Sequence, residues 1–270
     1  MLPGFAFSAT MGAYRFATTG PPVVKLHFLG TTGYHPNEKR QTACMMIPEQ
    51  GIIFDAGTGF FRTRDLICTN TLDIFLSHAH LDHSIGLTFL YDVLWDKDIE
   101  RVTVHVDGSK IPAIEQALYH KDLFPVGPNF DFKALKSEPV ELANDIKVHN
   151  CSLEHPGGSN GFRLEHPGGS LAYITDTVAQ KDAEYVEFIS NVDVLIHECY
   201  FPDGWEDRAQ LTGHSCLTPV AEVAAAANAG STYLVHINPL ESSDQPLDLA
   251  SVKETYANLN MTEDRMVINL

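Results

Sequence analysis

The segment LSHAHLDH at 76–83 constrains this chain more than any other part of its sequence. It follows an apolar, strand-like run and precedes a stretch of helical character. Two histidines at i and i+2 of an extended chain point to the same side, so His78 and His80 can share one metal ion. After the chain turns, Asp82 and His83 can face a second ion. With 13 histidines in 270 residues, chance produces this pattern in roughly one chain in 500, which disfavours a mere surface cluster.

A site for two metals needs further ligands, and the sequence offers them at the ends of other predicted strands. His155, Asp176 and His236 each close such a strand, and His214 sits in a Gly-His-Ser turn. His155 has a rival in His166, which lies in an identical LEHPGG context. We prefer His155, because PGG after the second copy is typical of a tight hairpin turn at the surface. Imidazole and carboxylate suit zinc and similar ions.

Strand-like runs alternate with helical stretches along the chain, and turn residues separate them. We expect strands at 23–30, 42–48, 51–57, 72–78, 101–107, 145–155, 161–166, 170–177, 192–198, 231–237 and 266–270. We expect helices near 58–67, 84–95, 110–120, 180–190, 217–229 and 247–258. This alternation predicts a layered α/β fold. Since no linker divides the chain, we expect one domain over 23–270, preceded by a mobile or loosely docked N-terminal arm over 1–22.

Charge and cysteine usage exclude several classes of protein. Lys and Arg number 18 against 35 Asp and Glu, so the net charge is −17, which repels long nucleic acids. The five cysteines contain no C-x-x-C pair, which argues against a disulfide framework and against a cysteine zinc cluster. No apolar run approaches the length of a membrane span, and residues 1–20 lack the pattern of a secretory signal. We expect a cytoplasmic protein with no membrane partner.

The order of short motifs along the chain resembles that of the metallo-β-lactamase fold superfamily. SHAHLDH is followed by LEHP, ITDT, HECY, GHS and LVHINP. LGTT at 29–32, FDAG at 54–57 and the HE and GHS motifs are similar to those of the ribonuclease Z-like phosphodiesterases. The resemblance spans about residues 23–240. It implies an α/β fold of the four-layer αβ/βα sandwich type, with the site at the edge of two sheets where loops gather.

The resemblance also implies a role for each candidate ligand. One metal ion would be held by His78, His80 and His155, and the other by Asp82, His83 and His236, with Asp176 bridging the two. We expect two divalent ions, with zinc as the default and manganese or iron as alternatives for this ligand set.

Further residues are candidates for the catalytic steps. Two neighbouring ions can hold a bridging water as hydroxide for attack on phosphorus, and Asp82 would help to orient it. His214 would contact the phosphate or protonate the leaving group, as the resemblance suggests, and Glu198 would orient His214. Lys39 and Arg40 follow the first strand, in a loop that borders the site in this family. They are candidate phosphate contacts or a solvated charged pair.

The chain departs from the tRNA-processing members at one point. Those members carry a long insertion that grips the tRNA, and in the long-insertion type it lies between the third histidine and the bridging aspartate. Only 20 residues separate His155 from Asp176 here. We therefore expect a phosphodiesterase for a small or nucleotide-like substrate, and we rank a ribonuclease Z-type tRNA 3′ endonuclease below it. The alternative is hydrolysis of a lactone, β-lactam or thioester at the same metals. The resemblance also implies a homodimer.

Overall fold

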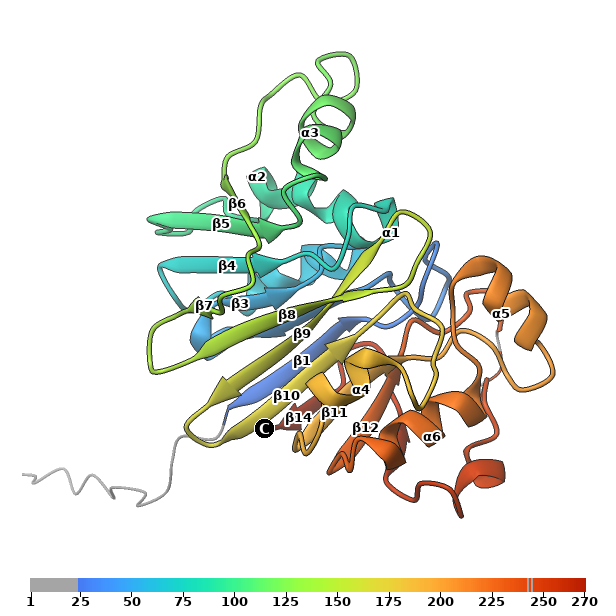
Figure 1. Cartoon of the computed structure of the whole chain (residues 1–270). Helices are drawn as coiled ribbons and strands as arrows, with labels where there is room; N and C mark the ends of the chain where they lie inside the picture. The colour runs from blue at the N-terminus through green and yellow to red at the C-terminus, as the bar shows by residue number, and fades with distance from the viewer. Residues whose placement is uncertain (1–23, 242, 244) are drawn as a thin grey trace, which may run out of the picture.

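Two mixed β-sheets lie face to face in the computed structural model, which describes residues 24–241, 243 and 245–270 (Figure 1). The arm expected over 1–22 lies outside these residues. In spatial order, the first sheet contains β14 (Val267–Asn269), β1 (Lys25–Gly30), β2 (Cys44–Ile47), β3 (Ile52–Phe54), β4 (Thr71–Phe75), β5 (Arg101–Val106) and β6 (Asp131–Ala134). Its pairs are antiparallel from β14 to β3 and parallel from β3 to β6.

The second sheet repeats this plan. In spatial order it contains β13 (Leu259–Met261), β12 (Ser231–Val235), β11 (Val194–Glu198), β10 (Gly169–Ile174), β9 (Ser159–His166), β8 (Lys147–Leu153) and β7 (Val140–Glu141). Its pairs are antiparallel from β7 to β10 and parallel from β10 to β13. In both sheets, therefore, the parallel strands aim their carboxyl ends at one edge.

Short helices cover the outer face of each sheet (Figure 1). Those on the first sheet are η2 (Thr58–Asp65), α1 (Leu81–Ser84), η3 (Ile85–Phe89), α2 (Leu90–Val93), α3 (Ile111–Ala113) and η4 (Ile114–Leu118). Those on the second sheet are α4 (Glu184–Phe188), α6 (Leu217–Ala226) and η5 (Leu249–Val252). The helix α5 (Glu206–Thr212) projects beside the edge where the parallel strands end, and η1 (Pro48–Gln50) links β2 to β3. None of the described helices is long and apolar enough to cross a bilayer.

Three hydrophobic clusters occupy the spaces between these layers. One lies between the two sheets and includes Phe28, Phe54 and Phe162. A second packs the first sheet against its helices, and a third packs the second sheet against α4 and α6. Three apolar interfaces separate four layers, so the predicted four-layer αβ/βα sandwich is confirmed.

The structure departs from the predicted elements mainly in the helices. Each predicted strand has a counterpart, but the runs at 58–67 and 247–258 form 3₁₀ helices, and 84–95 and 110–120 are broken into short turns. Packing against the sheet, rather than helix propensity, sets these lengths. The strands β6, β7 and β13 and the helix α5 were not predicted; each is short, with two to seven residues.

Candidate functional site

Three acidic or imidazole side chains lie at or just beyond strand ends at the shared edge of the two sheets: Asp176 and His236, which were predicted as ligands, and Asp55, which was not. Asp55 follows β3, Asp176 lies two residues beyond β10, and His236 follows β12. All three adopt the left-handed region, with φ of 57°, 51° and 56°. This conformation costs a non-glycine residue of order 1 kcal/mol or more, and such strain clusters at functional sites. The strand ends therefore turn sharply and aim these side chains at one point.

The first predicted trio of ligands, His78, His80 and His155, lies beside Oδ2 of Asp176. His78 Nε2 lies 3.6 Å and His155 Nε2 lies 3.5 Å from Asp176 Oδ2. His80 Nδ1 lies 3.4 Å from His155 Nε2. One ligand atom from each of these four residues lies within 4.8 Å of the others. The histidines come from the β4–α1 loop and from the loop after β8, so this group joins the two sheets.

The second predicted trio consists of Asp82, His83 and His236, and its two histidines lie beside Oδ1 of Asp176. His83 Nε2 and His236 Nε2 lie 3.2 Å and 3.3 Å from Asp176 Oδ1. The same two nitrogens lie 3.4 Å and 3.3 Å from Asp82 Oδ2. Each oxygen of one carboxylate thus faces its own trio, which is the arrangement a bridging ligand requires.

These separations fit metal coordination. A tetrahedral ion with ligands at about 2.0–2.2 Å spaces its ligand atoms about 3.3–3.6 Å apart. His78 Nε2 is buried and has no hydrogen-bond partner among the described residues, as is also true of His236 Nδ1. Burial and the nearby His83 hold the pKa of His78 well below its ordinary value, so its ring is neutral, as a ligand must be. Burial opposes protonation of His83, but Asp176, Asp82 and Asp55 outweigh it and raise its pKa, and the same negative field favours a bound cation.

Buried partners fix the orientation of the candidate ligands. The carboxylate of Asp55 accepts hydrogen bonds from His83 Nδ1 at 2.8 Å, from the Tyr173 hydroxyl at 2.6 Å and from the Ser77 backbone amide at 2.7 Å. The Ser77 hydroxyl also lies 3.0 Å from His78 Nδ1. These contacts hold the rings so that Nε2 faces the cluster, as outer partners of metal ligands do.

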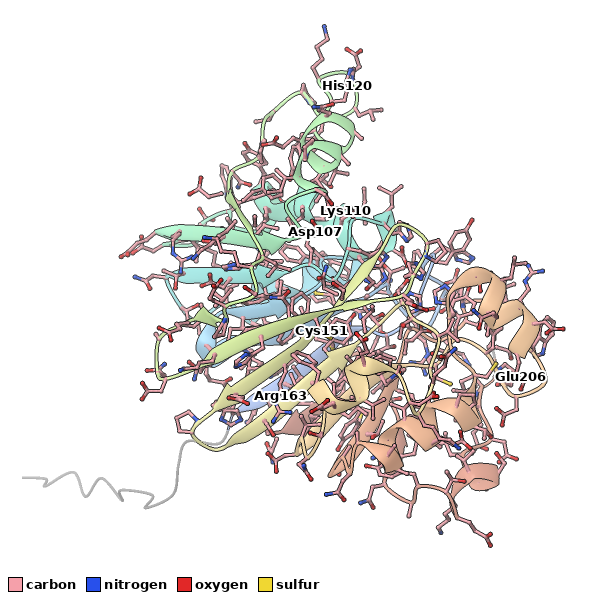
Figure 2. The ribbon with its side chains drawn as sticks, in the orientation of Figure 1. Asp107, Lys110, His120, Cys151, Arg163 and Glu206 are labelled. Carbon is pink, nitrogen blue, oxygen red and sulfur yellow. The ribbon has the colours of Figure 1, made fainter. Side chains whose placement is uncertain are left out.

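Two glycines allow close approach to the cluster. Gly213 ends α5 with φ of 74°, and its carbonyl accepts a hydrogen bond from His155 Nδ1 at 2.9 Å. A Cβ on Gly213 would lie 2.8 Å from that nitrogen, and a Cβ on Gly33 would lie 2.1 Å from Cε1 of His236. Only glycine fits at these positions without moving a ring. Two residues after His155, the Gly157 carbonyl accepts a hydrogen bond from Lys110 Nζ at 2.6 Å; Figure 2 labels Lys110.

His214 and Glu198 form a pair beside the cluster. Glu198 is fully buried at the end of β11, and its carboxylate lies 3.2 Å from His214 Nδ1. The same carboxylate accepts from the Thr177 amide at 2.7 Å, directly after Asp176. The His214 ring stacks on Tyr200 at 4.7 Å and lies 5.3 Å from the ring of His155. Glu198 therefore couples the turn at His214 to the turn that carries Asp176.

A cavity of about 830 Å³ opens onto this cluster. Its floor includes His80, Asp82, His155, Asp176, His214 and His236, and its walls include Tyr34, Tyr200, Phe201, Trp205, Arg208 and Leu240. Neither Lys39 nor Arg40 is among the described residues that line it. Arg40 Nη1 donates to the Thr31 hydroxyl and the Thr262 carbonyl, each at 2.6 Å, so this nitrogen is engaged within the protein, and the phosphate contact stays a prediction.

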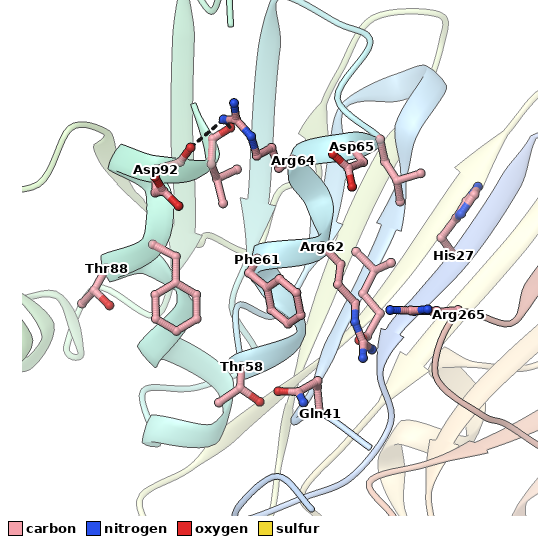
Figure 3. Close-up of a pocket in the computed structure, with 14 residues that line it drawn as sticks. His27, Gln41, Thr58, Phe61, Arg62, Arg64, Asp65, Thr88, Asp92 and Arg265 are labelled. Atoms are coloured by element: carbon pink, nitrogen blue, oxygen red, sulfur yellow. Dashed lines mark hydrogen bonds between the residues drawn. The ribbon is translucent and has the colours of Figure 1, made fainter. Parts of the chain in front are cut away.

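A second cavity, of about 990 Å³, lies on the helix-covered face of the first sheet (Figure 3). Phe61 lies at its centre, and Arg62, Arg64 and Arg265 are at its walls. Arg62 pairs with Asp264, and Arg64 donates to backbone carbonyls at the end of α2. No His and Asp cluster of the kind described above lies among its described lining residues.

Several residues around the cluster are not predicted by the sequence. FDAG resembles a family motif, but no role is predicted for its Asp55. Tyr173 gives no signal because an aromatic residue in a strand usually serves the core, and Tyr200 belongs to no local motif with a known chemical role. The wall formed by α5 was also missed. Its sequence, EDRAQLT, is too short and too polar to show helical periodicity.

Two face-to-face sheets with a His and Asp cluster at their common edge define a metal-dependent hydrolase of the metallo-β-lactamase fold. Residues 50–237 match the model of the β-lactamase superfamily domain, and the chain belongs to this family. Its curated relatives include ribonuclease Z of Archaeoglobus fulgidus, 25% identical over 91% of this chain and 97% of the relative. Ribonuclease Z of Lactobacillus johnsonii is 26% identical over 80% of this chain and 88% of the relative.

Solved structures share the fold. The metallo-β-lactamase fold protein YhfI from Bacillus subtilis has a TM-score of 0.76 at 17% identity, over 92% of this chain and 100% of that chain. The short form of human tRNase Z has a TM-score of 0.67 at 21% identity, over 90% and 98%. A diphosphatase of the PhnP family has a TM-score of 0.70 at 17% identity, over 92% and 98%. The predicted resemblance to the ribonuclease Z-like branch is therefore confirmed.

Proposed function

We propose that this protein is a binuclear metal-dependent phosphodiesterase that acts on a small or nucleotide-like phosphodiester. The observation that carries the proposal is the buried Glu198–His214 pair at the edge of the His and Asp cluster. Hydrolysis of a carbon ester or lactone needs an activated water and a polarised oxygen, which the cluster alone would supply. Esters and lactones also lose an alkoxide, but they are neutral at the reacting group. A protonated imidazole beside the cluster suits an anionic phosphodiester, because it can pair with a phosphoryl oxygen as well as protonate the leaving oxygen.

The proposed ligands are the two trios described above with Asp176 between them. Two divalent ions held there, with zinc as our proposal, would polarise the phosphoryl oxygens and lower the pKa of water. Asp82 lies at the floor of the cavity, where its carboxylate accepts from the Tyr34 amide at 2.7 Å. That hydrogen bond fixes the carboxylate, so Asp82 can orient the attacking water as well as bind metal.

His214 would supply the proton to the leaving oxygen. Burial disfavours its protonated form, but the nearby carboxylates, led by Glu198, outweigh burial and raise the pKa of His214 to about 9. Glu198 therefore favours the protonated imidazole. Because Nδ1 faces Glu198, Nε2 is the nitrogen left for the substrate. Glu198 would hold the ring in this orientation and stabilise its charge.

Ribonuclease Z activity is the second candidate, because the curated relatives named above carry that name. Two observations rank it lower. The chain between His155 and Asp176 is filled by the hairpin of β9 and β10, which leaves no arm to grip a tRNA. The alignment with the archaeal relative runs over 305 residues, more than the 270 of this chain, so that relative holds segments that this chain lacks. The charge of −17 also opposes a long polyanion.

The test is steady-state hydrolysis of bis(p-nitrophenyl) phosphate by zinc-loaded and manganese-loaded protein. We expect turnover that falls in His214→Ala and persists in the control His120→Ala, whose ring lies on a distant tip of the fold (Figure 2). A precursor tRNA with a 3′ trailer is assayed in parallel. Efficient cleavage of that RNA at its 3′ end would overturn the proposed substrate class. Turnover of a lactone or thioester by protein that is inert toward the phosphodiester would overturn the reaction class.

A further inference from the structure

The outer wall of the cavity at the metal cluster carries a rigid aromatic surface. Trp205, at the start of α5, is 53% exposed, and its indole stacks on Phe201 at 6.1 Å with an interplanar angle of 10°. Phe201 itself is buried, so it holds the indole from behind. Tyr34, on another loop of the same wall, is 75% exposed. An exposed aromatic face that is fixed in this way can stack against a planar group.

The same wall carries one cation. Arg208 is the only Lys or Arg among the described residues that line the cavity, although Asp82, Asp176 and Glu241 are also there. Its guanidinium is exposed and makes no hydrogen bond or ion pair with any described residue. In a chain with a net charge of −17, an arginine without a carboxylate partner at a cavity wall is available to an anion.

The cavity is large enough for more than the reacting phosphate. Its volume of about 830 Å³ lies in the range of sites that enclose a whole small ligand. The phosphate would occupy only the floor, between the cluster and His214. Trp205 and Arg208 stand three residues apart on and beside the first turn of α5, so they would meet a different part of the same ligand.

We propose that α5 and the loop before it recognise a nucleotide that carries a second anionic group, with the base on Trp205 and the second anion at Arg208. This inference rests on the proposed phosphodiesterase function, since it places the reacting phosphate at the cluster. It identifies the substrate class as a short nucleotide with two phosphorus groups rather than a polymer. One cation and one stacking face suffice for such a molecule, whereas a long strand needs many phosphate contacts.

Equilibrium binding to the metal-loaded protein tests both contacts without turnover. Isothermal titration calorimetry compares thymidine 3′,5′-bisphosphate with thymidine 5′-monophosphate, and the monophosphate with ribose 5-phosphate. We expect thymidine 3′,5′-bisphosphate to bind on the order of tenfold more tightly than thymidine 5′-monophosphate, because it makes one more charge-assisted contact. We expect thymidine 5′-monophosphate to bind on the order of tenfold more tightly than ribose 5-phosphate, because its base stacks on Trp205. R208Q should abolish the preference for the bisphosphate, and W205L should abolish the preference for the base, whereas W205F should retain part of it.

Lys181→Gln is the control for R208Q, because it makes the same change in net charge at an exposed residue paired with Glu222. Both preferences should survive in it. Equal affinities within each ligand pair in the wild type, or preferences that persist in R208Q and W205L, would overturn the inference. If R208Q weakened both thymidine ligands equally, Arg208 would serve the reacting phosphate, which also overturns it. If the protein hydrolyses bis(p-nitrophenyl) phosphate but binds both ligands of each pair with equal affinity, this inference alone is refuted. If it prefers the first ligand of each pair but hydrolyses no phosphodiester, the proposed function is refuted.

Discussion

Asp55→Asn should weaken metal binding without unfolding the protein, because it changes which nitrogen of the His83 ring carries the proton. Asp55 is fully buried, and its carboxylate accepts hydrogen bonds from Ser77, His83 and Tyr173. In the variant, the remaining oxygen can still accept from the Ser77 amide. The new amide group, however, points two hydrogens at His83 Nδ1 and at the Tyr173 hydroxyl. A hydroxyl can rotate to accept a hydrogen bond, but an imidazole N–H cannot.

His83 must therefore move its proton from Nδ1 to Nε2 or lose the contact. Nε2 is the nitrogen that lies 3.2 Å from Asp176 Oδ1 and 3.4 Å from Asp82 Oδ2, so protonating it removes the lone pair that a metal would use. If the proton stays on Nδ1, one buried donor loses its acceptor, at a cost of about 1–3 kcal/mol. We expect 10–100-fold weaker binding at the second metal position, as for other outer partners of metal ligands.

Metal stoichiometry by elemental analysis and affinity by chelator competition measure this loss, and urea denaturation of the metal-stripped protein measures the cost to folding. Asp145→Asn is the matched control, because Asp145 is exposed and has the same φ of 57°. Asparagine tolerates this conformation as well as aspartate does, so backbone strain cannot explain a difference between the variants. If Asp55→Asn binds two ions with the wild-type affinity, our assignment of Asp55 as the partner that sets the His83 tautomer is wrong.

Three further perturbations test other parts of the structure. Asp176→Ala should lower metal content and turnover together, because both trios contact its carboxylate; an active variant with both metals would contradict the bridging role. His214→Ala should keep both metals yet lose about 10²–10⁴-fold in kcat, as expected for a general acid, and a wild-type rate would contradict that role. Asp73→Asn tests acid stability: burial raises the pKa of Asp73, but hydrogen bonds from His105 and Arg101 outweigh it and lower the pKa from 3.8 to about 2. The carboxylate therefore adds about 2 kcal/mol above pH 4, which is lost as the pH falls toward 2. Urea denaturation across this range should show a loss about 2 kcal/mol larger in the wild type than in Asp73→Asn, and parallel curves would refute the assignment.

The sequence predicted the sheets and the ligand cluster for the same physical reason. Strands such as β4 and β10 are apolar runs that end abruptly at polar residues, and the chain must turn there because a buried strand cannot continue into water. His78 and Asp176 stand at those ends. Their position at predicted strand ends made these residues candidates, and the resemblance to the metallo-β-lactamase fold assigned them to two trios. Neither indicated that Asp176 would present a different oxygen to each trio.

The rest of the site depends on contacts between segments that are far apart in the chain. Asp55 and Tyr173 are separated by 118 residues, and their contact requires both sheets to be in place. The hydrogen bond from the Arg40 guanidinium to the Thr262 carbonyl, 222 residues away on a strand connection, is likewise revealed by no local pattern. Arg208 lies on a helix too short for periodicity to detect, so the wall that it forms could be found only in three dimensions.

The symmetry of the two sheets explains why a site of this kind stands at their edge. Each sheet has an antiparallel half and a parallel half, and the parallel halves send their carboxyl ends to the shared edge. The first sheet contributes the HAHLDH loop, and the second contributes His155, Asp176 and His236 from three separate loops. A cation held between them would contact both sheets at once, so the geometry of the candidate ligands is set by how the sheets pack. The large aromatic residues between the sheets, among them Phe54 and Tyr173, therefore position the cluster as well as forming the core.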